Sequence, residues 1–173
     1  KRVIGKTALL EFRKQLPNTS EDLKKLQFQR TKINNLIYEY DDLIKRKIDE
    51  NSLYKLNQSL IDIENEINFQ SKQNDFYKKT NDTRKFINTM IANLFIRTEL
   101  SGKDLISAGR RQEQVNNNWE VLLTFNNNGG DKFADITKSI AGTNRLLAIV
   151  LDGESISEAS VSNQFIKTGI TGG

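Results

Sequence analysis

The sequence predicts an α+β protein in which a small mixed or antiparallel sheet with packed helices is interrupted by a long, coiled-coil-like helical hairpin. Two observations predict this class. Strand-like segments lie toward both ends of the chain, whereas the middle repeats apolar residues at the three-four spacing of a helical seam. We therefore expect residues 1–16 and 97–173 to form a head-like α+β subdomain and residues 17–96 to form the hairpin insertion.

The first element, residues 7–13 (TALLEFR), carries apolar and β-branched residues between polar ones, which is typical of a strand. Successive side chains of a strand point to opposite faces of the sheet. We expect the face with Leu10 and Phe12 to be buried, rather than the face with Leu9 and Glu11.

The helical arm is predicted from two apolar series that are separated by the polar break at residues 49–52. A capping signal at residues 19–22 precedes the first series. The series are Leu23, Leu26, Ile33, Ile37, Tyr40, Ile44 and Ile48, and then Leu53, Leu56, Leu60, Ile63 and Ile67. Two such helices joined by a short polar turn cover each other's apolar stripes, so we expect an antiparallel hairpin.

A third helical stretch follows and runs to about Phe95. Its apolar face contains Phe86, Met90, Ile91 and Leu94. The pattern leaves open whether residues 80–82 break the second helix or bend it. Seams of this kind usually serve packing alone, so we interpret the arm as structural. A partner-binding groove on the arm is the alternative, and nothing in the local sequence identifies a partner.

The elements after the arm return to sheet character. Residues 119–125 (WEVLLTF) are strand-like, and the turn-rich cluster at 126–130 separates them from a helical stretch near 131–140. The apolar run at 146–151 (LLAIVL) predicts a buried strand. Asp152-Gly153 then predicts a tight corner into a further strand, so that a hairpin closes the sheet.

A nucleotide site is a competing interpretation of two of these features. Gly5-Lys6-Thr7 matches the end of the GxxxxGK[ST] phosphate loop, and Asp152 stands where a magnesium-binding acid could follow a strand. Only residues 1–4 precede Gly5, which leaves no room for the strand that such a loop requires. We therefore favour a strand lead for the first feature and a hairpin corner for the second.

Composition excludes several classes of site. The chain has no cysteine and no histidine, which rules out disulfides, thiolate metal sites and catalytic triads built on either residue. The formal net charge of +4 is spread among 26 basic and 22 acidic residues, so we expect no nucleic-acid partner. No apolar run is long enough to span a bilayer.

Four segments carry a family resemblance: VIGKTALLEFR (3–13), LSGKDLISA (100–108), the long string from Trp119 to Ser157, and the final TGITGG. In this order they resemble the first extracytoplasmic domain of the SecD family, membrane subunits that partner SecF in the Sec protein-export machinery. The intervening arm resembles the helical insertion of cyanobacterial and plastid-type members. The resemblance marks the chain as a piece of a longer membrane protein.

The resemblance implies a non-enzymatic domain on the periplasmic or lumenal side of the cell inner membrane or the thylakoid membrane, anchored by segments outside this chain. It implies binding of unfolded preprotein that emerges from the Sec channel, assistance by the proton-motive force, and contact with SecF and SecYEG through the full-length protein. The family's proton-pathway residues lie in membrane helices, so no catalytic, cofactor-binding or metal-binding residue is transferred to this chain. From the residues alone, a helical-hairpin module that binds a fixed protein partner remains the alternative function.

Overall fold

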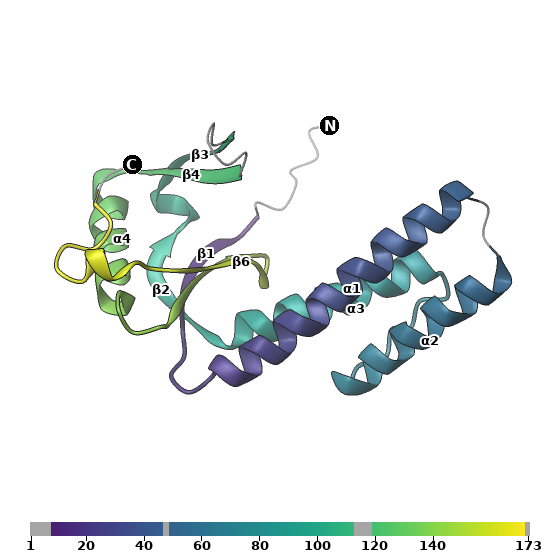
Figure 1. Ribbon diagram of the computed structural model, residues 1–173. Helices are drawn as coiled ribbons and strands as arrows, with labels where there is room; N and C mark the ends of the chain where they lie inside the picture. Colours follow the sequence, from purple (N-terminus) through teal and green to yellow (C-terminus); the bar gives the residue numbers. More distant parts are fainter. Residues whose placement is uncertain (1–7, 47–48, 113–118, 172–173) are drawn as a thin grey trace. The chain divides into compact units, whose positions relative to one another are not determined.

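The computed structural model describes residues 8–46, 49–112 and 119–171. The chain divides into two compact units (Figure 1). We call them the sheet unit, comprising 1–17 and 95–173, and the helical unit, comprising 18–94.

The sheet unit contains a four-stranded antiparallel sheet in the order β2-β1-β5-β6 and a separate antiparallel pair, β3 with β4, among the residues described. The strands are β1 (Leu10–Gln15), β2 (Phe95–Ser101), β3 (Leu105–Gln112), β4 (Trp119–Phe125), β5 (Leu146–Leu151) and β6 (Glu154–Ser160). The helix α4 (Asn127–Ile140) follows β4, and short 3-10 turns lie at η1 (Gly102–Asp104) and η2 (Asn163–Phe165). The predicted α+β class is confirmed, and all the described strand pairs are antiparallel.

The strand β1 lies in the middle of the larger sheet, although it comes first in the chain. Phe12 pairs with Ile149 of β5 on one side, and Gln15 pairs with Phe95 of β2 on the other. Both strands that pair with β1, namely β2 and β5, therefore come after the helical unit in the sequence.

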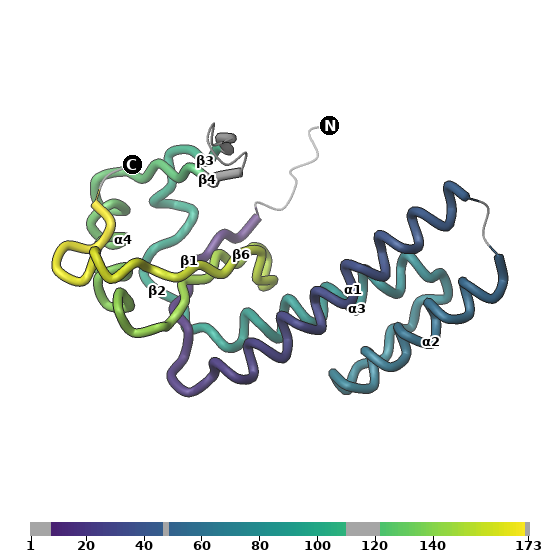
Figure 2. Tube along the Cα trace, viewed as in Figure 1, coloured from purple at the N-terminus to yellow at the C-terminus, as the bar shows by residue number. Residues whose placement is uncertain are grey.

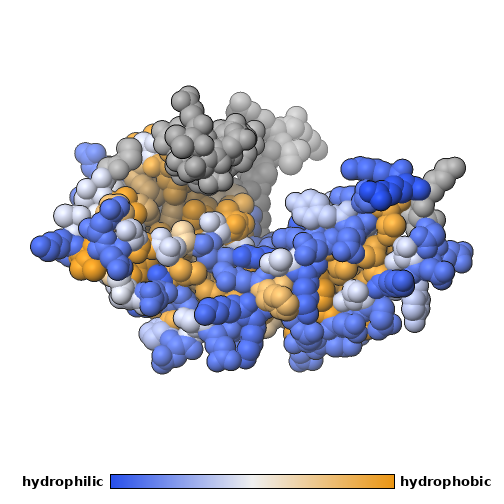
Figure 3. Space-filling model, viewed as in Figure 1, coloured by the Kyte–Doolittle hydropathy of each residue, from blue (hydrophilic) through white to orange (hydrophobic). Residues whose placement is uncertain are grey.

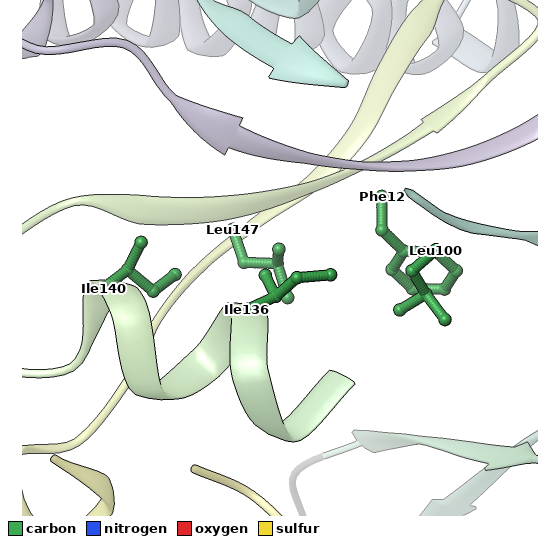
Figure 4. Packing of buried hydrophobic residues seen from close by; sticks show 5 residues of the cluster. All are labelled: Phe12, Leu100, Ile136, Ile140 and Leu147. Carbon is green, nitrogen blue, oxygen red and sulfur yellow. The ribbon is translucent and has the colours of Figure 1, made fainter. Parts of the chain in front are cut away.

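The core of the sheet unit lies between α4 and one face of the sheet. Its fully or nearly buried members are Phe12, Leu100, Ile136, Ile140 and Leu147. Figure 4 shows Ile136 and Ile140 projecting from α4 toward the side chains of the sheet. The ring of Phe12 also meets Phe125 edge to face, with ring centroids 5.5 Å apart. Burying each such side chain contributes about 1.5–3 kcal/mol, so this layer carries much of the unit's stability.

The expected burial of the Phe12 face is confirmed, because Phe12 is 0% exposed. The opposite face of β1 is also buried at Glu11, which is 7% exposed. The sequence pattern did not predict the burial of this carboxylate. Glu11 accepts from Arg97 Nε at 2.7 Å and from Arg13 Nε at 3.0 Å. A carboxylate can be buried when such partners balance its charge, so the ion pairs explain the exception.

The helical unit consists, in its described part, of α1 (Ser20–Arg46), α2 (Glu50–Glu66) and α3 (Phe76–Asn93). Asp49 caps α2 by accepting from Ser52 N, so most of the polar break predicted at 49–52 is the first turn of α2. The second helix ends at Glu66, and residues 80–82 lie inside α3. The unit is thus a three-helix arrangement in which α1 contacts both α2 and α3.

The predicted seam of α1 is buried at Leu23 and Ile33, but Ile44 is 52% exposed. Ile48 lies outside the described residues. Gln29 and Leu36 are buried although they lie off the seam. Because α1 packs against two helices, its buried stripe is wider than the seam of a two-helix hairpin. Figure 3 shows the remaining visible surface of the unit to be largely hydrophilic.

Candidate functional site

The corner between β5 and β6 settles the role of Asp152. Its φ angle is 50° and that of Gly153 is 87°, so both residues adopt the left-handed conformation of a tight hairpin turn. Asp152 Oδ1 accepts from Leu9 N at 2.8 Å, and Asp152 N donates to Leu9 O at 2.9 Å. The predicted hairpin corner is confirmed, and the carboxylate holds the chain that leads into β1. Gly5-Lys6-Thr7 lies outside the described residues.

Asp104 connects the end of β2 to the first turn of α4. Its carboxylate accepts from Ser101 N at 3.0 Å, from Lys132 Nζ at 2.9 Å and from Asn128 Nδ2 at 3.4 Å. The hydrogen bond from Lys132, together with that from the Ser101 N–H, holds the pKa of Asp104 below its ordinary value. The SGKD and GGDK segments therefore meet in one polar cluster around the buried carboxylate of Asp104, and this cluster fixes α4 on the sheet.

Two glycines of the motif segments allow close backbone approaches around α4. A Cβ at Gly129 would lie 2.7 Å from Asp104 Cβ and 2.9 Å from Asp104 O. A Cβ at Gly169, where φ is +70°, would lie 1.9 Å from Ala134 O. Beside it, Ile170 N donates to Thr137 Oγ1 at 2.8 Å. These motif residues hold the fold together, and none of them is arranged as a reactive group.

The candidate binding feature of the sheet unit is the outer edge of β6. Within the described residues β5 is its one paired strand, so the other edge has no strand beside it. Ile156 is 55% exposed, and Ser157, Ala159 and Ser160 are exposed as well. The strand reads ESISEAS and contains neither lysine nor proline, the residues that most often protect an edge, although a bulge opposite Ile149 interrupts its pairing.

Each edge strand carries two charged side chains, but those of β6, Glu154 and Glu158, are half-buried, whereas those of the other edge strand, β2, are exposed. The exposed pair on β2 is Arg97 and Glu99. They line a mixed-charge groove of about 470 Å³ together with Lys14, Thr98, Lys132, Asp135 and Ile136. Charged side chains along an edge discourage an added strand. The geometry therefore favours β6 as the place where an extended peptide could form main-chain hydrogen bonds.

No site residues were predicted from the sequence, and the edge residues of β6 were missed as candidates. The Asp152-Gly153 signal identifies the hairpin. It does not say that the second strand of this hairpin lies at the border of the sheet. In the described part of the chain, no helix combines the length and the apolar character that crossing a bilayer demands.

Comparison with known proteins gives a consistent result. The family described as SecDF, P1 head subdomain, matches residues 75–173, a range that begins at the N-cap of α3. The protein translocase subunit SecD of Prochlorococcus marinus is 46% identical over 99% of this chain, which spans 35% of that protein. SecD of Synechocystis sp. is 34% identical over 99% of the chain, which spans 31% of it.

The chain thus spans about a third of the length of these relatives. Among solved structures, SecDF, described as a membrane component that enhances protein export, is similar with a TM-score of 0.45 and 21% identity. That similarity covers 94% of this chain and 52% of the solved one.

Proposed function

The chain belongs to the SecDF P1 head family of protein translocase subunits, and on that premise we propose that it binds unfolded preprotein segments during export. In this proposal the domain lies on the periplasmic or lumenal side of the inner or thylakoid membrane, held there by segments outside this chain. Its contact with SecF and SecYEG is made through the full-length protein. The domain is not an enzyme; binding and release of preprotein, driven by the proton-motive force across the membrane part, bias the movement of the polypeptide.

The open edge of β6 is the observation that carries this proposal. A translocation subunit must hold chains of any sequence, and backbone N–H and C=O groups are what all unfolded chains share. The described edge offers these groups beside small, exposed side chains such as Ser157 and Ala159. We infer that a preprotein segment pairs with β6 as a temporary additional strand.

Such an interaction is weak enough to be reversible. A main-chain hydrogen bond contributes about 1 kcal/mol net, so about four of them give roughly 4 kcal/mol, which corresponds to a millimolar dissociation constant. An affinity of this size permits repeated capture and release, as stepwise transport requires. A tight peptide site would instead stop the chain that it is meant to pass on.

Photocrosslinking from the full-length SecD protein that contains this chain tests the proposal. A benzoylphenylalanine at Ser157 of β6 should crosslink to a preprotein arrested in the channel of translocating membrane vesicles. The same probe at Ser139, an exposed serine of α4, is the matched control and should crosslink far less. Crosslinks from Ser157 to one resident protein, and none to the preprotein, would contradict the proposal and favour a module with a fixed partner.

A further inference from the structure

The helix α1 extends beyond the end of α2 within the helical unit. The end of α2, at Glu66, lies beside the middle of α1, where Lys32 Nζ is 3.4 Å from Glu66 Oε1. The first turns of α1 therefore run on beside α3 without α2, as the traces of the three helices show (Figure 2). Along about nine residues of α1, roughly 14 Å of helix, no helix of the described helical unit continues the axis of α2.

A groove of about 650 Å³ occupies this vacant position. All of its lining residues belong to the helical unit. The apolar ones are Leu26 from α1, Ile67 from the end of α2, and Met90 and Leu94 from the end of α3. The polar ones are Asp22, Lys25, Gln29, Glu66, Asn68 and Asn93. The groove is thus an apolar trough with a polar rim, a form that suits an apolar peptide segment.

Gln29, which lines the groove, has a side-chain oxygen that accepts no hydrogen bond within the described residues. The residue is 8% exposed, and its Nε2 donates to Glu66 Oε2. Its Oε1 is buried and has no hydrogen-bond partner within the described residues. A buried oxygen without a donor is unfavourable, so a ligand that brings a donor gains by supplying it. Rotation about the terminal torsion of the side chain, a soft degree of freedom, exchanges the positions of Nε2 and Oε1, so this oxygen can take the place of Nε2 beside Glu66 and share a donor with that carboxylate.

The charges on the rim specify what kind of donor fits. Counted with their ion-pair partners, three carboxylates, Glu21, Asp22 and Glu66, stand against two ammonium groups, Lys25 and Lys32, so the rim keeps a net negative charge. The carboxyl end of α2 adds partial negative charge at the same place. The groove is therefore complementary to a cation that sits where α2 ends.

We propose that this groove binds a short apolar segment of a partner polypeptide that is led by a positively charged group. The apolar residues lie along the line that α2 leaves vacant, over Leu26, Met90 and Leu94. The leading lysine, arginine or amino terminus lies at the end of α2 and donates to Glu66 and Gln29. This site is separate from the β6 edge, and its occupant is selected by charge and apolarity rather than by backbone pairing.

Met90 makes the test direct, because it is the single methionine in the sequence. A chain labelled with ¹³C at the methionine methyl gives one signal, and that signal comes from the floor of the groove. A synthetic peptide of two lysines followed by seven leucine and alanine residues should shift this signal saturably. The same peptide led by two glutamates should bind at least about tenfold more weakly, the worth of a hydrogen bond to a charged group.

Two variants and one matched control distinguish binding in this groove from nonspecific binding of the apolar peptide. Glu66→Gln should weaken the lysine-led peptide about tenfold. Asp62→Asn removes a charge of the same sign from an exposed position one turn earlier in α2 and should leave the affinity unchanged. Gln29→Leu should weaken binding while it keeps or raises the thermal stability of the chain, because it also removes the unpartnered buried oxygen.

Three results would overturn the inference. They are a Met90 signal that does not move at millimolar peptide, equal shifts from the lysine-led and glutamate-led peptides, and equal losses for Glu66→Gln and Asp62→Asn. None of these results bears on the crosslinks expected from β6, so the two proposals fail or stand separately.

Discussion

Alanine substitutions at Gly129 and Gly130, neighbours in the first turn of α4, should change the stability of the sheet unit in opposite directions. Alanine favours a helix over glycine by about 1 kcal/mol, and both positions share that gain. A Cβ at Gly130 would have nothing within 4 Å, whereas one at Gly129 would meet Asp104 at 2.7 Å. The difference in stability between the two variants therefore measures the cost of crowding Asp104, because the gain in helix propensity is the same in both.

The magnitude follows from these contacts. Contacts of an ordinary Cβ begin near 3.4 Å, so Gly129→Ala must move the start of α4 away from Asp104 by more than half an ångström. Overpacking of this kind costs about 1–3 kcal/mol, and the strained bond from Lys132 to the Asp104 carboxylate adds up to about 1.5 kcal/mol. After the helix gain, Gly129→Ala should lose about 2 kcal/mol. For a unit of this size the melting temperature falls by about 10 °C, whereas Gly130→Ala raises it by about 4 °C.

Amide signals followed by NMR as the temperature rises are the suitable assay. Amides of β1 and β5 report on the sheet unit alone, while far-ultraviolet circular dichroism follows mainly the helices. The melting curves of these amide signals in the two variants should lie on opposite sides of the parent curve. If Gly129→Ala melts at or above Gly130→Ala, the packing of Asp104 against α4 does not limit stability and the reasoning is refuted.

Further substitutions probe the other contacts of the sheet unit. The depressed pKa of Asp104 means that its contribution to stability is present above the ordinary value of 3.8 and is lost as the pH falls through the lowered pKa. Melting temperatures below pH 3.8 should therefore fall less steeply in Asp104→Asn than in the parent, and equal slopes would show that Lys132 does not stabilise the charged form. Asp152→Ala removes the acceptor for Leu9 N and places alanine at φ 50°, so we expect a loss of about 2 kcal/mol and faster amide exchange at Leu9; an unchanged exchange rate would contradict this role. Glu11→Ala leaves two arginines without their shared carboxylate and should lower the free energy of unfolding in denaturant by about 3 kcal/mol. A loss under about 0.5 kcal/mol would mean that the group behaves as a surface pair.

Local signals were enough to predict several elements. The strand predicted at 7–13 overlaps β1, which begins at Leu10 and runs on to Gln15, and the apolar run LLAIVL matches β5. Asp152-Gly153 is the corner between β5 and β6. The capping signal at residues 19–22 also matches the start of α1 at Ser20. In each case the determining contacts lie within a few residues, as in turns and caps, or the period of the pattern is unambiguous.

The strand β2 was missed for a physical reason. It begins at Phe95, one residue after the C-cap of α3, with no glycine or proline to mark the change. The apolar pattern of α3 therefore continues into the strand, and the predicted helix ran on to Phe95. The burial of Glu11 was missed because Arg97, one of its two arginine partners, is distant in the sequence. The other partner, Arg13, lies two residues further along β1, and a Glu-x-Arg spacing occurs equally on exposed strand faces.

Both candidate binding features depend on tertiary arrangement. A hairpin signal identifies β6, but only the strand order β2-β1-β5-β6 places it at an edge. The groove on the helical unit follows from the shorter length of α2 relative to α1, whereas the seam pattern predicts an antiparallel hairpin without fixing where its second helix ends. Locating the end of the second helix at Glu66 would have exposed the mismatch.

The pairing of Gln15 with Phe95 has a consequence for the order of folding. The whole helical unit connects β1 to β2, where an ordinary hairpin has a short turn. Closing so long a connection costs about 2–3 kcal/mol more in chain entropy than closing a four-residue turn. Asp22 near the start of α1 and Leu94 at the end of α3 line the same groove, so collapse of the three helices alone draws the two strand ends together. We therefore expect the helical unit to associate before β1 pairs with β2. Mutations that loosen its helices would slow the pairing of β1 with β2 without altering a single residue of the sheet.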